Sequence, residues 1–188
     1  MFRTARTALV ATVGVVALIG GTATAGANQS PAPAAADPAA TSAAADPSYV
    51  QLQVKHSGKC LTVAKGSFKD RTAAVQSACA PETDHQLFRM VPTGPGTFEL
   101  RPRHSGRCLT TGSGHQWKAL QIWCGGVPEQ RWSVNLADVA TNLYEVRPDV
   151  ASEYCLTVSG AAVEENTDTY IGLCKGSSAS RWQILPAA

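Results

Sequence analysis

The sequence predicts an all-β domain built from three similar units. Residues 104–111 (HSGRCLTT) are nearly a copy of residues 56–63 (HSGKCLTV), which lie 48 positions earlier. A looser third copy, SEYCLTV, occupies residues 152–158. A repeat of this length is typical of one supersecondary unit that is used several times. Short alternating segments recur in each copy and no long helical period is present, which indicates strands rather than helices.

Each unit opens with a segment in which apolar and polar residues alternate, the pattern of a half-buried strand. These segments are residues 50–55, 98–101 and 144–147. A turn, the Cys-Leu-Thr strand and a polar loop follow, then a short strand that ends at the unit's second cysteine, and a closing aromatic motif that leads into a fourth strand. Four strands in each of three units predict about twelve strands, and the frequent turn signals favour a barrel or a sandwich.

The six cysteines all lie within the repeated part, where fifteen pairings are open in principle. Each unit holds two of them, so the repeat predicts one bridge in each unit. The predicted bridges are Cys60–Cys79, Cys108–Cys124 and Cys155–Cys174. Each would contribute on the order of 3 kcal/mol by restricting the unfolded chain. A zinc site is the alternative, but no C-x-x-C pair is present and the separations are too wide, so we expect no metal and no cofactor.

Residues 1–25 predict a secretory signal peptide. Arg3 and Arg6 precede an apolar run over residues 7–21, and the Ala-Thr-Ala of residues 23–25 offers a small-x-small cleavage pattern. The run is short for a membrane span, which needs about 20 residues. Residues 26–48 consist almost entirely of Ala, Pro, Ser, Asp, Thr and Gly and predict a disordered linker, either a tether or a tail without function. One domain remains over residues 49–188, with units at about 49–92, 97–136 and 142–186.

Charge and motifs exclude several function classes. The chain has 16 Lys and Arg against 14 Asp and Glu, and the two numbers become equal once Arg3 and Arg6 leave with the signal peptide. A neutral domain without a basic run lacks the electrostatic footprint of nucleic-acid binding, and anionic membranes are disfavoured for the same reason. The sequence contains neither G-x-S-x-G nor H-E-x-x-H, so we expect no enzyme, although a pair of carboxylates cannot be judged from sequence. His56 and His104 recur at equivalent positions, which predicts a role in the turn.

The first two units contain Gly-Lys/Arg-Cys-Leu. All three units have a second cysteine 16 to 19 residues after the first, and each closes with Gln-x-Trp or a variant of it. This combination resembles the ricin B-chain-type β-trefoil lectins over about residues 49–186. The resemblance implies a β-trefoil with pseudo-threefold symmetry and one disulfide in each repeat. It places Phe88, Trp132 and Trp182 in the common core. Together with the predicted signal peptide and linker, the resemblance predicts a secreted, extracellular and monomeric carbohydrate-binding module, without catalysis, for sugars of the galactose, xylose or arabinose class.

In this family each unit can carry a shallow sugar site. The site uses an Asp just after Cys-Leu, an aromatic residue two positions before the second cysteine, and Asn-Gln or His near the closing motif. A carboxylate accepts hydrogen bonds from sugar hydroxyls, and an aromatic face packs on the sugar ring. This sequence departs from that pattern, because the Asp position holds threonine in every unit. The aromatic position holds Ser77, Ile122 and Gly172.

The resemblance leaves nine candidate carbohydrate-binding residues. They are Thr62, His85 and Gln86 in unit 1, Thr110, Trp117, Trp123 and Gln130 in unit 2, and Thr157 and Tyr170 in unit 3. Alternatively, the two tryptophans serve only in packing, Trp123 against the disulfide and Trp117 over a seam. Asp70 is predicted to form a turn. A millimolar site has only about 4 kcal/mol of binding free energy, and loss of a charged acceptor and an aromatic removes most of it. The alternative function is therefore a trefoil that binds a protein partner, as an inhibitor or effector.

Overall fold

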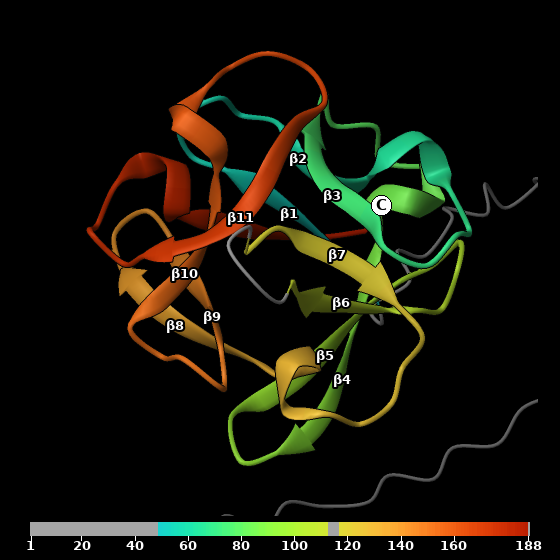
Figure 1. The fold of residues 1–188 in the computed structure, drawn as a ribbon. Helices are drawn as coiled ribbons and strands as arrows, with labels where there is room; N and C mark the ends of the chain where they lie inside the picture. Colours follow the sequence, from blue (N-terminus) through green and yellow to red (C-terminus); the bar gives the residue numbers. More distant parts are fainter. Residues whose placement is uncertain (1–48, 113–116, 188) are drawn as a thin grey trace, which may run out of the picture. The chain divides into compact units, whose positions relative to one another are not determined.

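The computed structural model describes residues 49–112 and 117–187, and the predicted signal peptide and linker lie outside these ranges. Within them the chain is all β, and the twelve predicted strands are confirmed (Figure 1). The strands are β1 Tyr49–Val54, β2 Cys60–Val63, β3 Thr72–Ser77, β4 Phe88–Gly94, β5 Thr97–Pro102, β6 Cys108–Thr111, β7 Ala119–Ile122, β8 Trp132–Asp138, β9 Leu143–Pro148, β10 Tyr154–Val158, β11 Thr167–Leu173 and β12 Trp182–Pro186. Short 3-10 turns occur at η1 Ala64–Gly66, η2 Asp84–Gln86, η3 Pro128–Gln130, η4 Ser159–Ala161 and η5 Ser178–Ser180.

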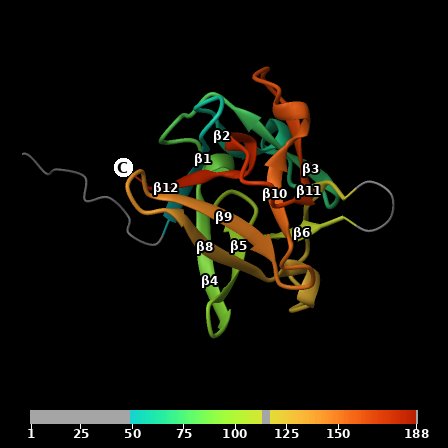
Figure 2. The ribbon, with the colours of Figure 1, turned by 90° about the vertical axis from the view of Figure 1, so that its left-hand side faces the viewer.

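Six of the strands close into a barrel. Each neighbouring pair is antiparallel, in the order β1, β4, β5, β8, β9, β12 and back to β1. Figure 2 shows β8 and β9 side by side, near β4 and β5. The hairpins β4–β5 and β8–β9 carry the chain from one unit to the next, and β12 closes the ring on β1. Closure removes the exposed strand edges that an open sheet would leave.

The other six strands form three hairpins that cover one end of the barrel. The hairpins are β2–β3, β6–β7 and β10–β11, one from each unit. They contact each other in a triangle: β3 pairs with β7 through Thr72 and Gln121, β11 pairs with β3 through Thr167 and Gln76, and Lys118 bridges to Tyr170. The predicted β-trefoil with pseudo-threefold symmetry is therefore confirmed.

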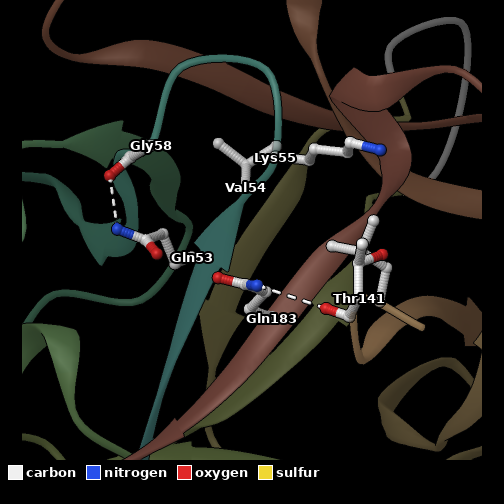
Figure 3. Close-up of a pocket in the computed structure, with 7 residues that line it drawn as sticks. Gln53, Val54, Lys55, Gly58, Thr141 and Gln183 are labelled. Carbon is white, nitrogen blue, oxygen red and sulfur yellow. Dashed lines mark hydrogen bonds between the residues drawn. The ribbon is translucent and has the colours of Figure 1, made fainter. Parts of the chain in front are cut away.

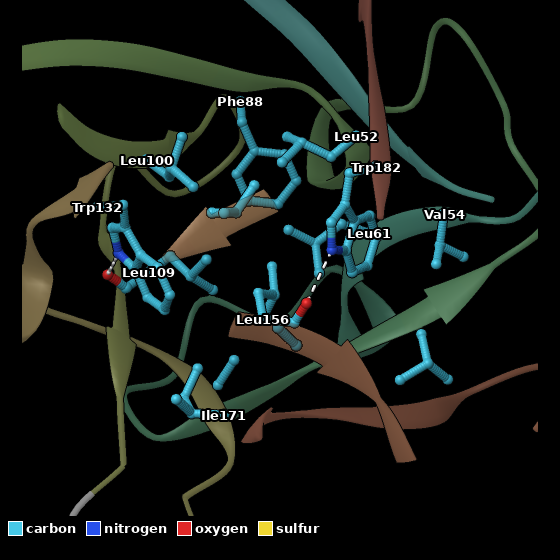
Figure 4. Packing of buried hydrophobic residues seen from close by; sticks show 14 of the residues in the cluster. Leu52, Val54, Leu61, Phe88, Leu100, Leu109, Trp132, Leu156, Ile171 and Trp182 are labelled. Atoms are coloured by element: carbon cyan, nitrogen blue, oxygen red, sulfur yellow. Dashed lines mark hydrogen bonds between the residues drawn. The ribbon is translucent and has the colours of Figure 1, made fainter. Parts of the chain in front are cut away.

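Large side chains at equivalent positions fill the core (Figure 4). Phe88, Trp132 and Trp182 begin the last strand of each unit and have no exposed surface. The two indole N–H groups donate to the carbonyls of Leu109 and Leu156, both at 2.9 Å, so neither tryptophan buries an unsatisfied donor. Their positions agree with the core that the family resemblance implies.

Three polar residues that the alternation assigned to the outer face are buried. Gln51, Glu99 and Glu145 occupy the same place in β1, β5 and β9 and are 4–7% exposed. They lie beneath the cysteine loops, where Gln51 donates to the Ala80 carbonyl at 3.0 Å. The two glutamates instead pair with the arginine two residues later, at 2.6 Å in each case. The prediction failed because the loop that covers this face comes from a distant part of the unit.

The predicted disulfide pairing is confirmed. Cys60–Cys79, Cys108–Cys124 and Cys155–Cys174 each join Cα atoms 5.0–5.2 Å apart. The third strand of each unit ends one or two residues before the unit's second cysteine, rather than at it as predicted. The register explains this, because Cys60 lies opposite Ser77, and the chain must turn back before Cys79 can reach it. Among the described residues, none of the helical segments is long and apolar enough to cross a membrane.

Candidate functional site

The loop of one unit lies against the cysteine hairpin of the next. Where unit 1 meets unit 2, the buried side chain of Gln121 donates to the carbonyls of Ser67 and Lys69, at 2.5 and 2.9 Å. His104 Nε2 lies 3.0 Å from the same Ser67 carbonyl. Ser105 donates its hydroxyl to the Gln121 amide oxygen at 2.9 Å, which fixes the orientation of the amide. The loop of unit 1 is thus held by polar side chains of unit 2.

The seam between unit 3 and unit 1 repeats this arrangement. Gln76 donates to the carbonyls of Ala162 and Glu164, at 2.7 and 2.9 Å. His56 Nε2 lies 2.8 Å from the Ala162 carbonyl, and Ser57 donates to the Gln76 amide oxygen. The two histidines therefore belong to the seams between units, which explains why they recur in the sequence.

A carboxylate closes each of these two seams. Asp70 Oδ1 accepts a hydrogen bond from Arg107 Nε at 2.8 Å and one from the backbone N–H of Trp123 at 3.1 Å. At the other seam Glu165 pairs with Lys59 and accepts a bond from the backbone N–H of Ala78 at 3.0 Å. The hydrogen bond from Lys59, followed by that from Ala78, holds the pKa of Glu165 below its ordinary value. We call these the Asp70 clamp and the Glu165 clamp.

The third seam, between units 2 and 3, uses an aromatic contact. The Trp117 ring lies 4.9 Å from the Tyr154 ring, measured between centroids, and Tyr154 occupies the position of Lys59 and Arg107 in the repeat. The Trp117 carbonyl accepts a bond from the Ile171 N–H at 2.7 Å. Trp117 is 39% exposed, so much of its ring packs on the seam.

The residue pair Asp70 and Arg107, together with Trp123, forms the candidate site, which we call the Trp123 corner. The Arg107 guanidinium lies over the Trp123 ring, 4.8 Å from its centroid, in cation–π geometry. Trp123 is nevertheless 68% exposed. Both bonds to Asp70 use Oδ1, and Oδ2 has no donor in the described part of the chain. The corner therefore presents a fixed aromatic ring beside a carboxylate oxygen that can accept hydrogen bonds.

The threonines at the Asp position are withdrawn from the surface. Thr62, Thr110 and Thr157 are 3–6% exposed. Thr62 donates its hydroxyl to the Cys60 carbonyl at 2.9 Å, and Thr110 donates to the Glu129 carbonyl at 3.2 Å. Hydroxyl groups that are committed to the backbone in this way have little capacity left for a ligand.

The two closing glutamines are also buried, at 2–3% exposure. Gln130 donates to the Trp123 carbonyl at 2.7 Å and accepts from the Gly125 N–H at 2.8 Å. Gln86 makes the matching pair of bonds with Ala78 and Ala80 in unit 1. Each glutamine thus holds the backbone of its cysteine loop. In unit 2 this fixes the chain at Trp123 itself.

His85 lies in a small aromatic cluster at the seam of units 1 and 2. Its ring centroid is 6.0 Å from that of His104, and Phe68, 62% exposed, packs on the other side of His104 at 5.2 Å. A Cβ at Gly66 would come within 3.0 Å of His85 Nδ1, and Gly66 has a φ of +59°, so glycine is required there. Partial burial, and then the charge of His104, lower the pKa of His85, whereas Asp84 opposes the shift.

Tyr170 lies over the Gly172 position of unit 3. A Cβ at Gly172 would lie 2.9 Å from Tyr170 Cε2 and 3.1 Å from Thr157 Cγ2. Thr157 and Tyr170 also face each other in the β10–β11 register. The two candidates of unit 3 are therefore in one place, but the tyrosine ring occupies the space that an aromatic at position 172 would take.

The sequence pattern singles out Trp123 as a candidate but not its two partners, Asp70 and Arg107. Asp70 was assigned to a turn, and its ion pair with Arg107 spans 37 residues. A signal was present, because a basic residue precedes the first cysteine in both unit 1 and unit 2, as Lys59 and Arg107. An acidic residue in the loop of the preceding unit is its partner in each case.

Two groups of side chains have the spacing of metal ligands in the described residues. Glu99 lies beside Cys108 and Cys124, and Glu145 lies beside the cysteines of unit 3. Both cysteine pairs are disulfides, which have no thiolate to offer a metal. These groups therefore do not fit a metal site.

Residues 40–123 match the family model described as "Ricin-type beta-trefoil lectin domain-like". No curated protein matches the chain. Among solved structures, the designed threefold-symmetric protein ThreeFoil is 25% identical, with a TM-score of 0.67 over 73% of this chain and 98% of its own. The Rhizoctonia solani agglutinin is 16% identical, with a TM-score of 0.66 over 73% of this chain and 94% of its own. These findings confirm the resemblance to the ricin-type β-trefoil lectins.

Other similar structures include a lectin in complex with a sugar and one domain of a larger enzyme. The C-half of an earthworm R-type lectin, solved in complex with GalNAc, is 12% identical, with a TM-score of 0.59 over 74% of this chain and 99% of its own. The exo-β-1,3-galactanase of Clostridium thermocellum is 21% identical, with a TM-score of 0.68 over 75% of this chain. The chain spans only 30% of that enzyme, so the likeness concerns one domain of it.

Proposed function

We propose that this chain, a ricin-type β-trefoil in its described residues, is a secreted, non-catalytic module that binds carbohydrate through the Trp123 corner. The observation that carries the proposal is the Trp123 ring, which is 68% exposed although Arg107 packs on it and Asp70 binds the backbone N–H of Trp123. A large aromatic ring in open solvent gains little for the fold itself. Such a ring contributes favourable free energy only when a binding partner covers its exposed face.

The chemistry of the corner suits a sugar ring. The apolar C–H face of a galactose-, xylose- or arabinose-type ring can pack on the free face of Trp123. A hydroxyl at the ring edge can donate to Asp70 Oδ2 in a charge-assisted hydrogen bond. The backbone at Trp123 is already fixed by Gln130 and Asp70, so binding orders few additional groups.

Magnitudes indicate a weak site. Covering one aromatic face contributes about 1–2 kcal/mol by area, and one hydrogen bond to a charged acceptor about 1.5–3 kcal/mol. Their sum is close to the roughly 4 kcal/mol of a millimolar complex. Affinity of this order is useful on a polysaccharide, where many sugar units surround each bound module and promote rebinding.

Three features support an extracellular place of action. The three disulfides are consistent with an oxidising compartment. Residues 1–25 have the sequence of a signal peptide, and residues 26–48 that of a linker, which would let the domain reach an insoluble polysaccharide. We propose a monomer, because one corner on one chain is sufficient for this activity.

The test is retention of the purified chain on insoluble galactan, xylan and arabinan. We expect retention on at least one of them, and we expect the Trp123→Ala variant to bind at least tenfold more weakly with its melting temperature nearly unchanged. Trp117→Ala is the matched control, because Trp117 packs on Tyr154 and its loss should lower stability but leave binding intact. Equal retention of Trp123→Ala and the unchanged chain would contradict the proposal, as would no retention on any of the three.

A further inference from the structure

A second concave site lies outside the three family positions, where the last strand meets the first. Its volume is about 230 Å³. It is lined by Gln53, Val54, Lys55 and Gly58 of unit 1, by Thr141 and Leu143 at the start of unit 3, and by Gln183 of β12 (Figure 3). We call it the seam pocket. It is smaller than the roughly 300–1,000 Å³ typical of drug-sized ligands, so it suits a single small ring.

Two amide groups have a fixed orientation in the seam pocket. Gln53 Nε2 donates to the Gly58 carbonyl at 2.8 Å, and Gln183 Nε2 donates to the Thr141 carbonyl at 3.3 Å. The two glutamines face each other in the β1–β12 register. Figure 3 shows their oxygens directed toward one another, while the nitrogens point to the carbonyls of Gly58 and Thr141. The pocket therefore presents two hydrogen-bond acceptors, whereas Val54 and Leu143, which also line it, are 0% and 1% exposed and offer a ligand almost no apolar surface.

The equivalent seam of units 1 and 2 shows why the hollow is open here. There the cross-strand pair is Arg101 with Arg89, and the neighbouring strand contributes Tyr49 in place of Leu143. The Arg103 guanidinium lies over the Tyr49 ring, 5.7 Å from its centroid. At the seam of units 1 and 2, the Tyr49 ring and the Arg103 guanidinium therefore fill the space. At the seam of units 3 and 1, Leu143 and the two glutamines leave the equivalent space open.

The chemistry of the lining favours a neutral, hydroxyl-rich ligand. Two amide oxygens accept hydrogen bonds from hydroxyl groups but repel a carboxylate or a phosphate. The Lys55 charge is partly balanced by Asp138, whose pKa is lowered chiefly by a hydrogen bond from Thr141 and to a smaller degree by Lys55. A small hollow with a few convergent polar groups fits the hydroxyl groups of one sugar ring.

We infer that the seam pocket binds one neutral sugar ring, with two of its hydroxyl groups donating to the amide oxygens of Gln53 and Gln183. This site is independent of the Trp123 corner and unlike the three equivalent family positions. It arises where the chain closes the barrel on itself, so only one copy is expected in the molecule. It would give the module a second point of attachment along a polysaccharide.

The test is an NMR titration of the full chain carrying Trp123→Ala, which removes the corner from the measurement. Methyl β-D-galactopyranoside and methyl β-D-xylopyranoside are the neutral probes, and D-galacturonate is the anionic one. We expect saturable shifts of the Gln53 and Gln183 side-chain amides at millimolar concentration for at least one neutral probe. Galacturonate should shift these groups at least fivefold more weakly.

Two variants keep the inference open to contradiction. Leu143→Tyr introduces the residue that the unit 1–unit 2 seam carries and should fill the pocket, while Gln183→Leu removes one acceptor. Both should abolish the shifts while the dispersed backbone spectrum shows an intact fold. No saturable shift with either neutral probe would overturn the inference, and so would shifts that persist in Leu143→Tyr. Because Trp123 is absent throughout, failure here leaves the polysaccharide-binding test of the Trp123 corner unaffected.

Discussion

The corners of unit 1 and unit 2 have the same framework but a different surface. In both, a buried glutamine holds the neighbouring loop. A carboxylate from that loop binds a basic side chain and the backbone N–H of the residue two positions after the glutamine. In unit 1 that N–H belongs to Ala78, and in unit 2 it belongs to Trp123. The framework is therefore structural, and the exposed tryptophan is an addition to it. The addition is the part that needs a functional explanation.

The largest expected effect tests the shared framework. Gln121 and Gln76 have no exposed surface, and each satisfies two loop carbonyls and a serine hydroxyl. Gln121→Leu should lower the free energy of unfolding by about 2–4 kcal/mol, because it leaves buried polar groups without partners, and Gln76→Leu should cost a similar amount. Chemical denaturation measures both. A loss below about 0.5 kcal/mol in either, comparable to that of the exposed control Asn135→Ala, would show that the seams do not depend on these amides.

The second prediction concerns a variant in which a tryptophan is placed at position 78 of unit 1, the equivalent of Trp123. Ala78 is exposed, and its backbone is already held by the Glu165 clamp and by Gln86. Ala78→Trp should therefore create a second corner in unit 1, beside Lys59 instead of Arg107. Two corners on one module should raise apparent affinity for an insoluble polysaccharide about tenfold through avidity, with little effect on soluble monosaccharide. Ala78→Leu, which adds apolar surface without an aromatic face, is the control. Equal gains from both variants would argue against aromatic recognition.

A smaller effect on polysaccharide binding should distinguish the Asp70 clamp from the Glu165 clamp. Asp70→Asn removes the charge of the acceptor beside Trp123, and Glu165→Gln makes the same change at the corner that lacks an aromatic. The stability cost of Asp70→Asn should stay below about 1 kcal/mol, because the pair is partly exposed. Polysaccharide binding should fall about five- to tenfold for Asp70→Asn and remain unchanged for Glu165→Gln. Equal binding by both variants would remove Asp70 from the proposed site.

The difference between the corners also marks what sequence alone could predict. The strands follow from local alternation, the disulfides from the repeat, and the core positions of Trp132 and Trp182 from the family resemblance, and the structure confirms all three. The clamps join residues of different units, as Asp70 with Arg107, and no local pattern encodes that contact. Local propensity therefore assigned Asp70 to a turn. The seam pocket was missed for the same reason, since it depends on Leu143 standing where another unit has Tyr49.

The smallest expected effect is a pH dependence confined to one seam. Units 1 and 2 meet at His85 and His104, with Phe68 and Asp84 beside them, whereas unit 3 has Ala179 at the position of His85. The pKa of His85 is lowered from its ordinary value of 6.5, first by partial burial and then by His104, so the unfolded chain binds this proton more readily than the folded one. Stability should therefore be unaffected at pH values well above 6.5 and should fall as the pH drops through and below that value.

Melting temperatures between pH 5 and pH 8 measure this dependence, a window above the range in which Glu165 and Asp138, whose pKa values are lowered, change protonation. The decline should be small, because His85 is only partly buried, and His85→Ala should flatten it while leaving the melting temperature at pH 8 nearly unchanged. His104 remains in that variant and still bonds to the Ser67 carbonyl, so the seam itself persists. If the melting temperature of His85→Ala fell with pH as steeply as that of the unchanged chain, the acid sensitivity would belong to another group. The unit 1–unit 2 and unit 3–unit 1 seams would then not differ in their response to pH.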